Sequence, residues 1–244
     1  MAATIISLIG PPGSGKGTYG AMLAARFLNG AFLSVGDILR QNATQNTALN
    51  QILLSGTLAD DAFVGDAVLQ RMKTIVNDKT LSMMKSHEYH GKPVVVLDGF
   101  PRNHAQTLVL SNWPIEARPS LAIQFDVPDD ICITKLLGRR KCSLCSGSFN
   151  INGVDTGGFV MPPILPAKDV CQTKCNWDVD WRKRDDDTAE TIRKRMEVYH
   201  EKTEPVLNYW RDRDELIRFV PFNGVKDMGK LESLLLKRIG KNDS

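Results

Sequence analysis

The chain has 244 residues, 42% of them hydrophobic and 24% charged, which is enough to bury a core and is typical of soluble globular proteins. A net charge of +3, without a basic run longer than three residues, excludes a polyanion-binding tail. No apolar run approaches the roughly 18 residues of a membrane span, and the N-terminus lacks the basic start of a secretion signal. We expect a cytoplasmic protein that binds neither nucleic acid nor membrane, in which structural disulfides are disfavoured.

Strand-like and helical patterns alternate along the chain. Short runs rich in β-branched residues predict strands over residues 4–9, 31–34, 94–97, 121–127 and 216–220. Their nearly continuous apolar character is typical of parallel strands covered on both faces. Helices are expected over residues 18–28, 36–43, 61–76, 105–111, 130–140, 188–213 and 226–239. This alternation predicts an α/β fold with a central parallel five-stranded sheet.

Two segments interrupt the alternation. Residues 41–91 are mostly helical in pattern and contain no convincing strand, so we expect a small helical cap there. Within it, residues 79–91 look like an insertion of no evident purpose. Residues 141–183 differ sharply in composition, with four cysteines, a Gly-Gly pair and prolines that exclude a continuous helix. We interpret this second segment as an inserted subdomain.

The first predicted strand leads directly into the stretch GPPGSGKGT at residues 10–18. Glycines between a strand and a helix let the backbone approach a phosphate closely, with consecutive N–H groups directed at the anion. Lys16 adds a full positive charge, and the helix beginning near Thr18 adds its positive end. A tight turn with a surface lysine is the alternative, and the strand–loop–helix context argues against it. We predict a phosphate-binding loop.

The loop departs from the pattern G-x-x-x-x-G-K-[ST] at one position. Gly17 follows Lys16 where a serine or threonine usually binds Mg²⁺, and the hydroxyl comes one residue later, at Thr18. The metal would then be held mainly by nucleotide phosphates and water, which Mg²⁺ tolerates. This arrangement favours a kinase of small molecules over switch GTPases and motor ATPases.

Five further motifs follow the loop, namely 34-SVGDILR-40, 98-DGFPR-102, 126-DVPDDICITKLLGRR-140, 184-RDDDTAETIRKR-195 and 199-YHEKTEP-205. Together with the loop they resemble the nucleoside monophosphate kinases, most closely the long-lid adenylate kinases, over nearly the whole chain. The resemblance implies a P-loop three-layer fold. Its core would comprise residues 1–33, 92–140 and 184–244, with a helical monophosphate-binding domain at 34–91 and a lid carrying four cysteines at 141–183.

The resemblance also implies the reaction. A monomer would transfer the γ-phosphoryl group of ATP reversibly to AMP, giving two ADP, with Mg²⁺ as cofactor. The acceptor phosphate oxygen is already anionic, so no general base is required, and catalysis depends on positioning and charge stabilisation. The motifs suit this chemistry because they are rich in arginine and poor in histidine.

The resemblance assigns roles to individual residues. Asp98 would orient the water shell of Mg²⁺, while Asp186 and Asp187 resemble lid carboxylates that position arginines and the ribose. The expected catalytic residues are Lys16, Arg102, Arg139, Arg184 and Arg195. The expected ATP site comprises Gly13, Ser14, Gly15, Lys16, Gly17, Thr18, Lys135 and Arg139. The expected AMP site comprises Arg40, Gly99, Arg102, Gln106, Arg184 and Arg195.

Two positions depart from the adenylate kinase pattern. Val35 stands where a hydroxyl residue usually contacts the acceptor, which removes a hydrogen bond worth about 0.5–1.5 kcal/mol. Lys135 stands where an arginine usually stacks on the donor base, and an ammonium cannot reproduce a guanidinium plane. ATP and GTP therefore both stay open as donors. Gln106 favours AMP as the acceptor, with a surface glutamine on a first helical turn as the alternative.

Four cysteines, Cys142, Cys145, Cys171 and Cys175, lie within the predicted lid. Many adenylate kinases hold a structural Zn²⁺ there on two Cys-x-x-Cys pairs, and four thiolates would stabilise a segment with few apolar residues. The second pair here has an extra residue, so Asp178 could replace Cys175 as a ligand. Free thiols, or a disulfide under oxidation, are the alternatives.

A hypothesis from another class is a nucleotide-binding protein without catalysis that uses its lid as an interaction surface. The complete arginine set argues against this hypothesis. A binding module needs no charges that converge on a transferring phosphoryl group. We therefore expect an enzyme.

Overall fold

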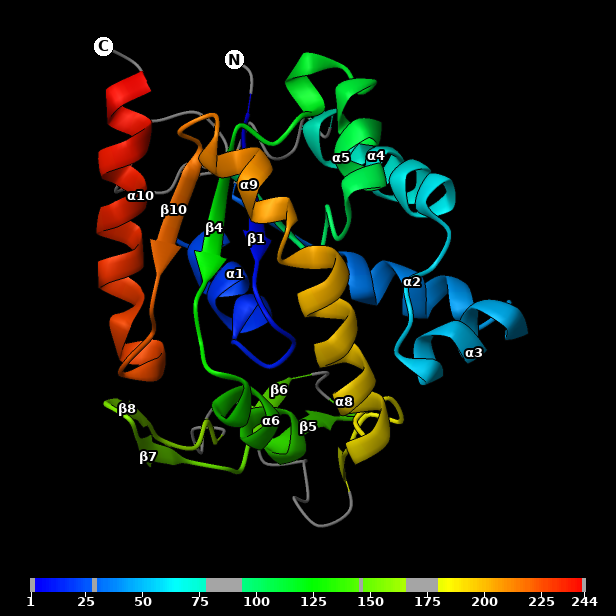
Figure 1. The fold of residues 1–244 in the computed structure, drawn as a ribbon, viewed down its shortest axis with the longest axis vertical. Helices are drawn as coiled ribbons and strands as arrows, with labels where there is room; N and C mark the ends of the chain where they lie inside the picture. The colour runs from blue at the N-terminus through cyan, green and yellow to red at the C-terminus, as the bar shows by residue number, and fades with distance from the viewer. Residues whose placement is uncertain (1–2, 28–29, 78–93, 145–146, 166–179, 243–244) are drawn as a thin grey trace.

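A five-stranded parallel sheet forms the centre of the molecule, as expected (Figure 1). The computed structural model describes residues 3–27, 30–77, 94–144, 147–165 and 180–242. Neighbouring strands follow the order β10-β4-β1-β3-β2, and every pair is parallel. The strands are β1 (Thr4–Ile9), β2 (Ala31–Ser34), β3 (Val94–Asp98), β4 (Leu121–Phe125) and β10 (Leu216–Phe219).

Helices cover both faces of the sheet, which explains why its strands are apolar without alternation. Ile6 and Leu8 of β1 pack on one face with α1 (Lys16–Ala24) and α10 (Met228–Asn242). Ile5 and Ile9 belong to the core of the opposite face. That face carries α5 (His104–Ser111) and α9 (Val206–Arg211), with the short turn η2 (Ile115–Ala117) nearby. Burial of each such side chain stabilises the fold by about 1.5–3 kcal/mol.

Along the chain, three helices come between β2 and β3. They form a unit that projects beyond the β2 edge of the sheet (Figure 1). It consists of α2 (Val35–Ala43), α3 (Thr47–Ser55) and α4 (Asp61–Asn77). Side-chain caps begin two of the helices, because Ser34 Oγ accepts from the Asp37 N–H and Asn46 Oδ1 from the Leu49 N–H. The insertion expected at residues 79–91 lies outside the described residues.

Antiparallel strands follow α6 (Asp129–Gly138) at the carboxyl end of the central sheet (Figure 1). A three-stranded sheet contains β6 (Ser148–Asn150), β5 (Arg139–Cys142) and β9 (Trp181–Arg182) in that order. A hairpin contains β7 (Val154–Thr156) and β8 (Phe159–Met161). The hairpin also contacts the core, because the Val160 N–H donates to the Phe222 carbonyl at 2.7 Å and the two rings of Phe159 and Phe222 are 5.0 Å apart.

The helix expected over residues 188–213 is wrong as a single helix. The chain instead forms α8 (Ala189–Val198), a π-helical turn η3 (Tyr199–Thr203) and then α9. Pro205 follows this turn and has no N–H to continue an α-helical pattern. The Glu204 N–H reaches back to the Tyr199 carbonyl at 2.8 Å, which widens the turn by one residue.

Other boundaries differ by a few residues. The helix expected at 130–140 ends at Gly138, and Arg139 has the extended ψ of 135° that opens β5. A Cβ on Gly138 would lie 2.6 Å from atoms of both Asn150 and Asn152, so only glycine allows these two residues to approach here. Before α10, the turn η4 (Gly224–Asp227) precedes the helix proper. Within the described residues, no helix has the length and apolarity to cross a bilayer.

Candidate active site

A cavity of about 590 Å³ opens at the carboxyl end of β1 and β3. Ligands bind at this edge in open α/β sheets, because helix N-termini and loops converge there. Most of the residues expected from the sequence line it. They are Gly13, Ser14, Gly15, Lys16, Gly17, Thr18, Arg40, Asp98, Gly99, Arg102, Lys135, Arg139, Arg184 and Arg195. Four described residues with an expected role in the site do not line the cavity, namely Gln106, Cys142, Asp186 and Asp187.

Glycines shape the loop between β1 and α1. Gly15 precedes the helix in a left-handed conformation with φ 92°, and no side chain caps the first turn of α1. The N–H groups of that turn are therefore left to bind an anion. Gly13 packs against α6, where a Cβ would lie 2.3 Å from the Cys132 carbonyl oxygen. The loop thus needs glycine both for its turn and for its contact with α6.

The Lys16 ammonium folds back over this loop. Its Nζ donates to the carbonyls of Gly10 and Pro11, each at 2.7 Å, and to Ser14 Oγ at 3.2 Å. Removal of the amino group from water lowers the pKa of Lys16 to about 8; Asp98 opposes this shift, and the Arg102 and Arg195 cations add to it. A phosphate bound in the cavity would place a negative charge beside this ammonium and stabilise its charged form.

Asp98 ends β3 directly beside the loop. Its Oδ2 lies 3.5 Å from the position that a Cβ on Gly17 would take. No side chain of residue 17 therefore fills the space between the carboxylate and the loop. Water and carboxylate oxygens are ligands that Mg²⁺ accepts readily, so the residues present fit a metal held by phosphates and a water shell.

Arg102 follows the same strand end and is fixed by backbone contacts. Its Nε donates to the Gly99 carbonyl at 3.0 Å, and Thr203 Oγ1 donates to the carbonyl of Arg102 at 2.8 Å. Gly99 has φ 91°, and a Cβ there would lie 2.8 Å from the guanidinium. Burial lowers the pKa of Arg102. Thr203, which lies in the π-turn and lines the cavity, was not among the site residues expected from the sequence.

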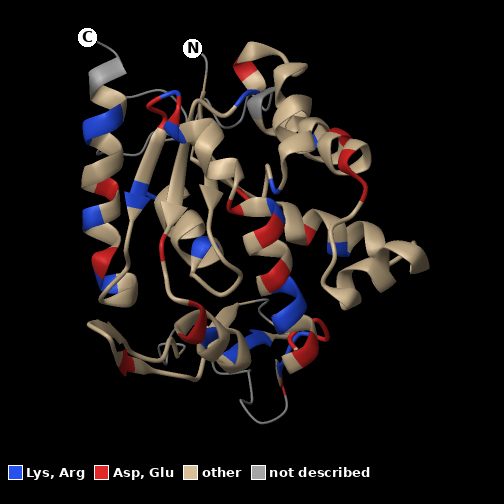
Figure 2. Ribbon diagram, in the orientation of Figure 1, with Lys and Arg blue, Asp and Glu red and all other residues tan. Residues whose placement is uncertain are grey.

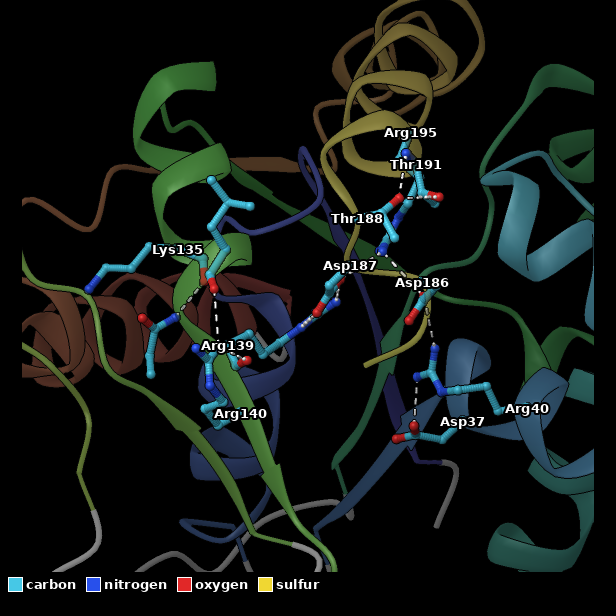
Figure 3. Close-up of polar contacts among 12 residues, drawn as sticks. Asp37, Arg40, Lys135, Arg139, Arg140, Asp186, Asp187, Thr188, Thr191 and Arg195 are labelled. Carbon is cyan, nitrogen blue, oxygen red and sulfur yellow. Dashed lines mark hydrogen bonds and ion pairs between the residues drawn. The ribbon is translucent and has the colours of Figure 1, made fainter. Parts of the chain in front are cut away.

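Two adjacent aspartates organise the arginines from three elements (Figure 3). Asp187, which is fully buried, receives two hydrogen bonds from Arg139, at 2.7 and 2.5 Å. Arg195 Nη1 approaches Asp187 at 3.4 Å and Asp186 at 3.3 Å. Bidentate pairing of this kind fixes both the distance and the plane of a guanidinium. In Figure 2, charged residues of both signs gather along α8 and the loop before it.

A family model described as Adenylate kinase matches residues 8–215 of the chain. The chain belongs to the adenylate kinase family. It is 33% identical over 236 residues to the GTP:AMP phosphotransferase of Plasmodium falciparum, covering 95% of each chain. It is 31% identical to the adenylate kinase of Clostridium botulinum strain Alaska E43, covering 97% of this chain and 99% of the relative. The expectation of a nucleoside monophosphate kinase is confirmed.

Several cations crowd this cavity of the adenylate kinase family member. Arg40 Nη2 donates to Asp37 at 2.7 Å, and its Nη1 lies 3.8 Å from Asp186. Burial, with Arg139 nearby, lowers the pKa of both Arg184 and Arg195 to about 10. The site therefore holds more positive charge than its aspartates compensate, which favours a polyphosphate ligand.

The Gln106 amide is engaged within the protein. Its Oε1 accepts from the Arg102 N–H at 2.7 Å, and its Nε2 donates to Asp61 Oδ1 at 2.8 Å. Asn103 also donates to Asp61 Oδ1, at 2.8 Å. Asp61 was not predicted, because no local pattern links residue 61 to residue 106. The role of Gln106 in reading the AMP base stays a prediction.

The Lys135 ammonium contacts the backbone of the segment that follows β6. It donates to the carbonyls of Asn152, Met161 and Pro162 at 2.9, 3.2 and 3.4 Å. Burial lowers the pKa of Lys135. An ammonium has three N–H donors, and the three carbonyls occupy one donor each.

Of the four lid cysteines, only Cys142 lies in the described part of the chain. It is buried in β5 and packs with Phe149 and Trp181. Among the residues that the structure describes, no group of three or more His, Cys, Asp or Glu side chains is placed to hold a metal ion. Since Cys145, Cys171 and Cys175 are not described, the zinc site stays a prediction.

Proposed function

We propose that this protein reversibly transfers the γ-phosphoryl group of ATP to AMP, giving two ADP, in a Mg²⁺-dependent reaction. The observation that supports this reaction best is a single cavity bounded by the phosphate-binding loop and by Arg40, Arg102, Arg139, Arg184 and Arg195. Two relatives in the family carry the names adenylate kinase and GTP:AMP phosphotransferase. Transfer between two phosphate groups requires many cations and no base, which is what the cavity offers.

The roles of the residues follow from their positions. Lys16 and the loop N–H groups would hold the donor phosphates, and Arg40 and Arg102 would hold the acceptor phosphate. Arg139, Arg184 and Arg195 would stabilise the charge on the transferring group. Asp187 would keep two of these guanidinium groups in place through the contacts described above. When bound, Mg²⁺ would neutralise charge on the donor phosphates, with Asp98 holding part of its water shell.

Three parts of the chain would have different functions. Residues 1–33, 92–140 and 184–244 would form the core, residues 34–91 would bind AMP, and residues 141–183 would form the lid. Helices α2 to α4 and the strands β5 to β9 are the elements that would close over the substrates. Closure would exclude water, which otherwise accepts the phosphoryl group. A cytoplasmic monomer whose partners are only nucleotides completes the proposal.

The base of the phosphoryl donor, adenine or guanine, is the part of the substrate pair that the assay must determine. GTP stays a candidate because the Plasmodium falciparum relative is named a GTP:AMP phosphotransferase. A phosphoryl-transfer assay with Mg²⁺, crossing ATP and GTP against AMP, UMP, CMP and GMP, tests the reaction. Turnover with AMP is the expected result. Absence of transfer to every monophosphate would leave only the binding function.

The same assay on Lys135→Ala shows what this residue does. We expect the KM values for ATP and GTP to rise together, by about tenfold, because backbone carbonyls of residues 152–162 use the three N–H donors of the ammonium. Thr134→Ala, on the same helix with an exposed hydroxyl, is the matched control and should behave as wild type. A change in the ratio of ATP to GTP turnover would instead assign base recognition to Lys135.

Zinc in the lid is part of the proposal, with Cys142, Cys145, Cys171 and Cys175 as ligands. We expect about one equivalent of zinc per purified chain by metal analysis, as a closed structural site requires. Removal by a chelator should lower the unfolding temperature, and replacement of zinc should restore it. Metal-free protein with full activity would favour free thiols.

A further inference from the structure

The C-terminal end of α3 contacts the first turns of α8. The hydroxyl of Thr191 donates to the Leu54 carbonyl at 2.9 Å. Carbonyls in the last turn of a helix have no partner within that helix. Here one of them is satisfied from another unit of the protein. Thr191 is only 8% exposed, so its hydroxyl would otherwise be poorly hydrated.

Gly56 brings the two elements into close contact. It ends α3 in a left-handed conformation with φ 75°. A Cβ at this position would lie 2.9 Å from Arg195 Cγ and 3.1 Å from the Thr191 carbonyl oxygen. Gly56 and Arg195 both line the cavity. The end of α3 therefore lies against the stem of an arginine that faces the substrate space.

The Thr191 hydroxyl has a fixed direction. Thr188, the N-cap of α8, donates its hydroxyl hydrogen to Thr191 Oγ1 at 3.0 Å and accepts from the Thr191 N–H at 3.1 Å (Figure 3). Because the Thr191 oxygen accepts from Thr188, its own hydrogen is directed to Leu54. Asp186 and Asp187, which hold Arg195, immediately precede Thr188 in the sequence.

We infer that Thr191 is a positioning residue that docks the α2–α4 unit on α8 and so couples acceptor binding to the placement of Arg195. This inference rests on the proposed function, in which the α2–α4 unit binds AMP. Arg195 follows Thr191 by four residues, so both lie on one face of α8. Loss of the hydroxyl releases the end of α3 and leaves the fold of α8 intact.

Thr191→Val tests the inference, because it removes the hydroxyl and keeps the shape. We expect the KM for AMP, and its Kd measured by calorimetry without donor, to rise about three- to tenfold, as for loss of one hydrogen bond. The KM for the donor should stay constant. Thr191→Ser should restore AMP affinity. Thr107→Val is the matched control, since this buried hydroxyl bonds only within its own helix, to the His104 carbonyl.

The outcomes separate the two proposals. A wild-type protein that transfers no phosphoryl group would overturn the proposed function. An active wild type, with AMP affinity unchanged in Thr191→Val, would overturn the inference, even if the variant unfolds at a lower temperature. Gly56→Ala gives an independent result if Thr191→Val does not fold. Its Cβ should displace Arg195 and lower kcat, and a kcat equal to that of wild type would contradict the coupling.

Discussion

Replacing Lys16 with methionine should lower kcat/KM by about two to three orders of magnitude, as for other single groups that stabilise transition-state charge. The ammonium lies inside the loop with Gly10, Pro11 and Ser14 as its partners, and methionine cannot supply its charge or its N–H donors. The native fold should not suffer, because removal from water and two nearby arginines already disfavour the charge. Steady-state kinetics and thermal unfolding measure the two effects separately.

The control for this substitution is Lys194→Met. Lys194 lies on α8 and pairs at 3.2 Å with Glu197, and both side chains are about half exposed. This variant should retain full activity, because exposed pairs contribute little. Activity of Lys16→Met within a few-fold of wild type would remove Lys16 from the mechanism.

The lowered pKa of Lys16 should make both donor binding and stability of the wild-type protein depend on pH. In the free enzyme, donor affinity should fall as the pH rises through about 8, because only the ammonium form attracts phosphate. In the unfolded chain the group titrates near 10.5, so between these values the unfolded state binds more protons. Its contribution to native stability therefore increases with pH in that window. Nucleotide titrations from pH 7 to 9 test the first effect.

Replacing Asp187 with asparagine should destabilise the fold by about 3 kcal/mol, because Arg139 loses its buried counter-charge and Arg195 keeps only Asp186. For a chain of this length, that loss corresponds to a decrease in unfolding temperature of about 6–12 °C. Activity should fall as well, since both guanidinium groups line the cavity. Differential scanning calorimetry measures the stability.

Asp185→Asn is the matched control, because Asp185 is an exposed neighbour on the same loop. It should unfold at the wild-type temperature. A polyphosphate should restore part of the lost stability in Asp187→Asn, since its charge replaces the carboxylate and it binds only the native state. An unchanged unfolding temperature in Asp187→Asn would show that the pair contributes nothing.

The central sheet could be predicted because its signal is local. Residues 4–9 and 31–34 were expected as strands with the observed bounds. A short continuous run of apolar residues is enough to predict a strand that is covered on both faces. The phosphate-binding loop was equally clear, because its glycines and Lys16 are adjacent. Family membership was also predictable, since the motifs occur in one order along the chain.

Other features depend on contacts between distant residues. Nothing near Thr191 or Thr203 indicates that their hydroxyls reach the carbonyls of Leu54 and Arg102. The break between α8 and α9 was missed although Pro205 marks it, because charged helical residues continue on both sides. Arg139 was expected in a helix, and its extended backbone depends on the approach of Asn150 and Asn152 to Gly138.

The hairpin of β7 and β8 limits how this protein can be recombined with its relatives. The proposed lid, residues 141–183, joins the rest of the chain at its two ends and again through Phe159 and Val160, which contact Phe222. The loop that carries Phe222 is itself held to α1, because the Tyr19 hydroxyl donates to the Gly224 carbonyl. A lid exchanged as a cassette would meet a foreign surface there. Functional chimeras should therefore require residues 221–224 to be exchanged together with the lid.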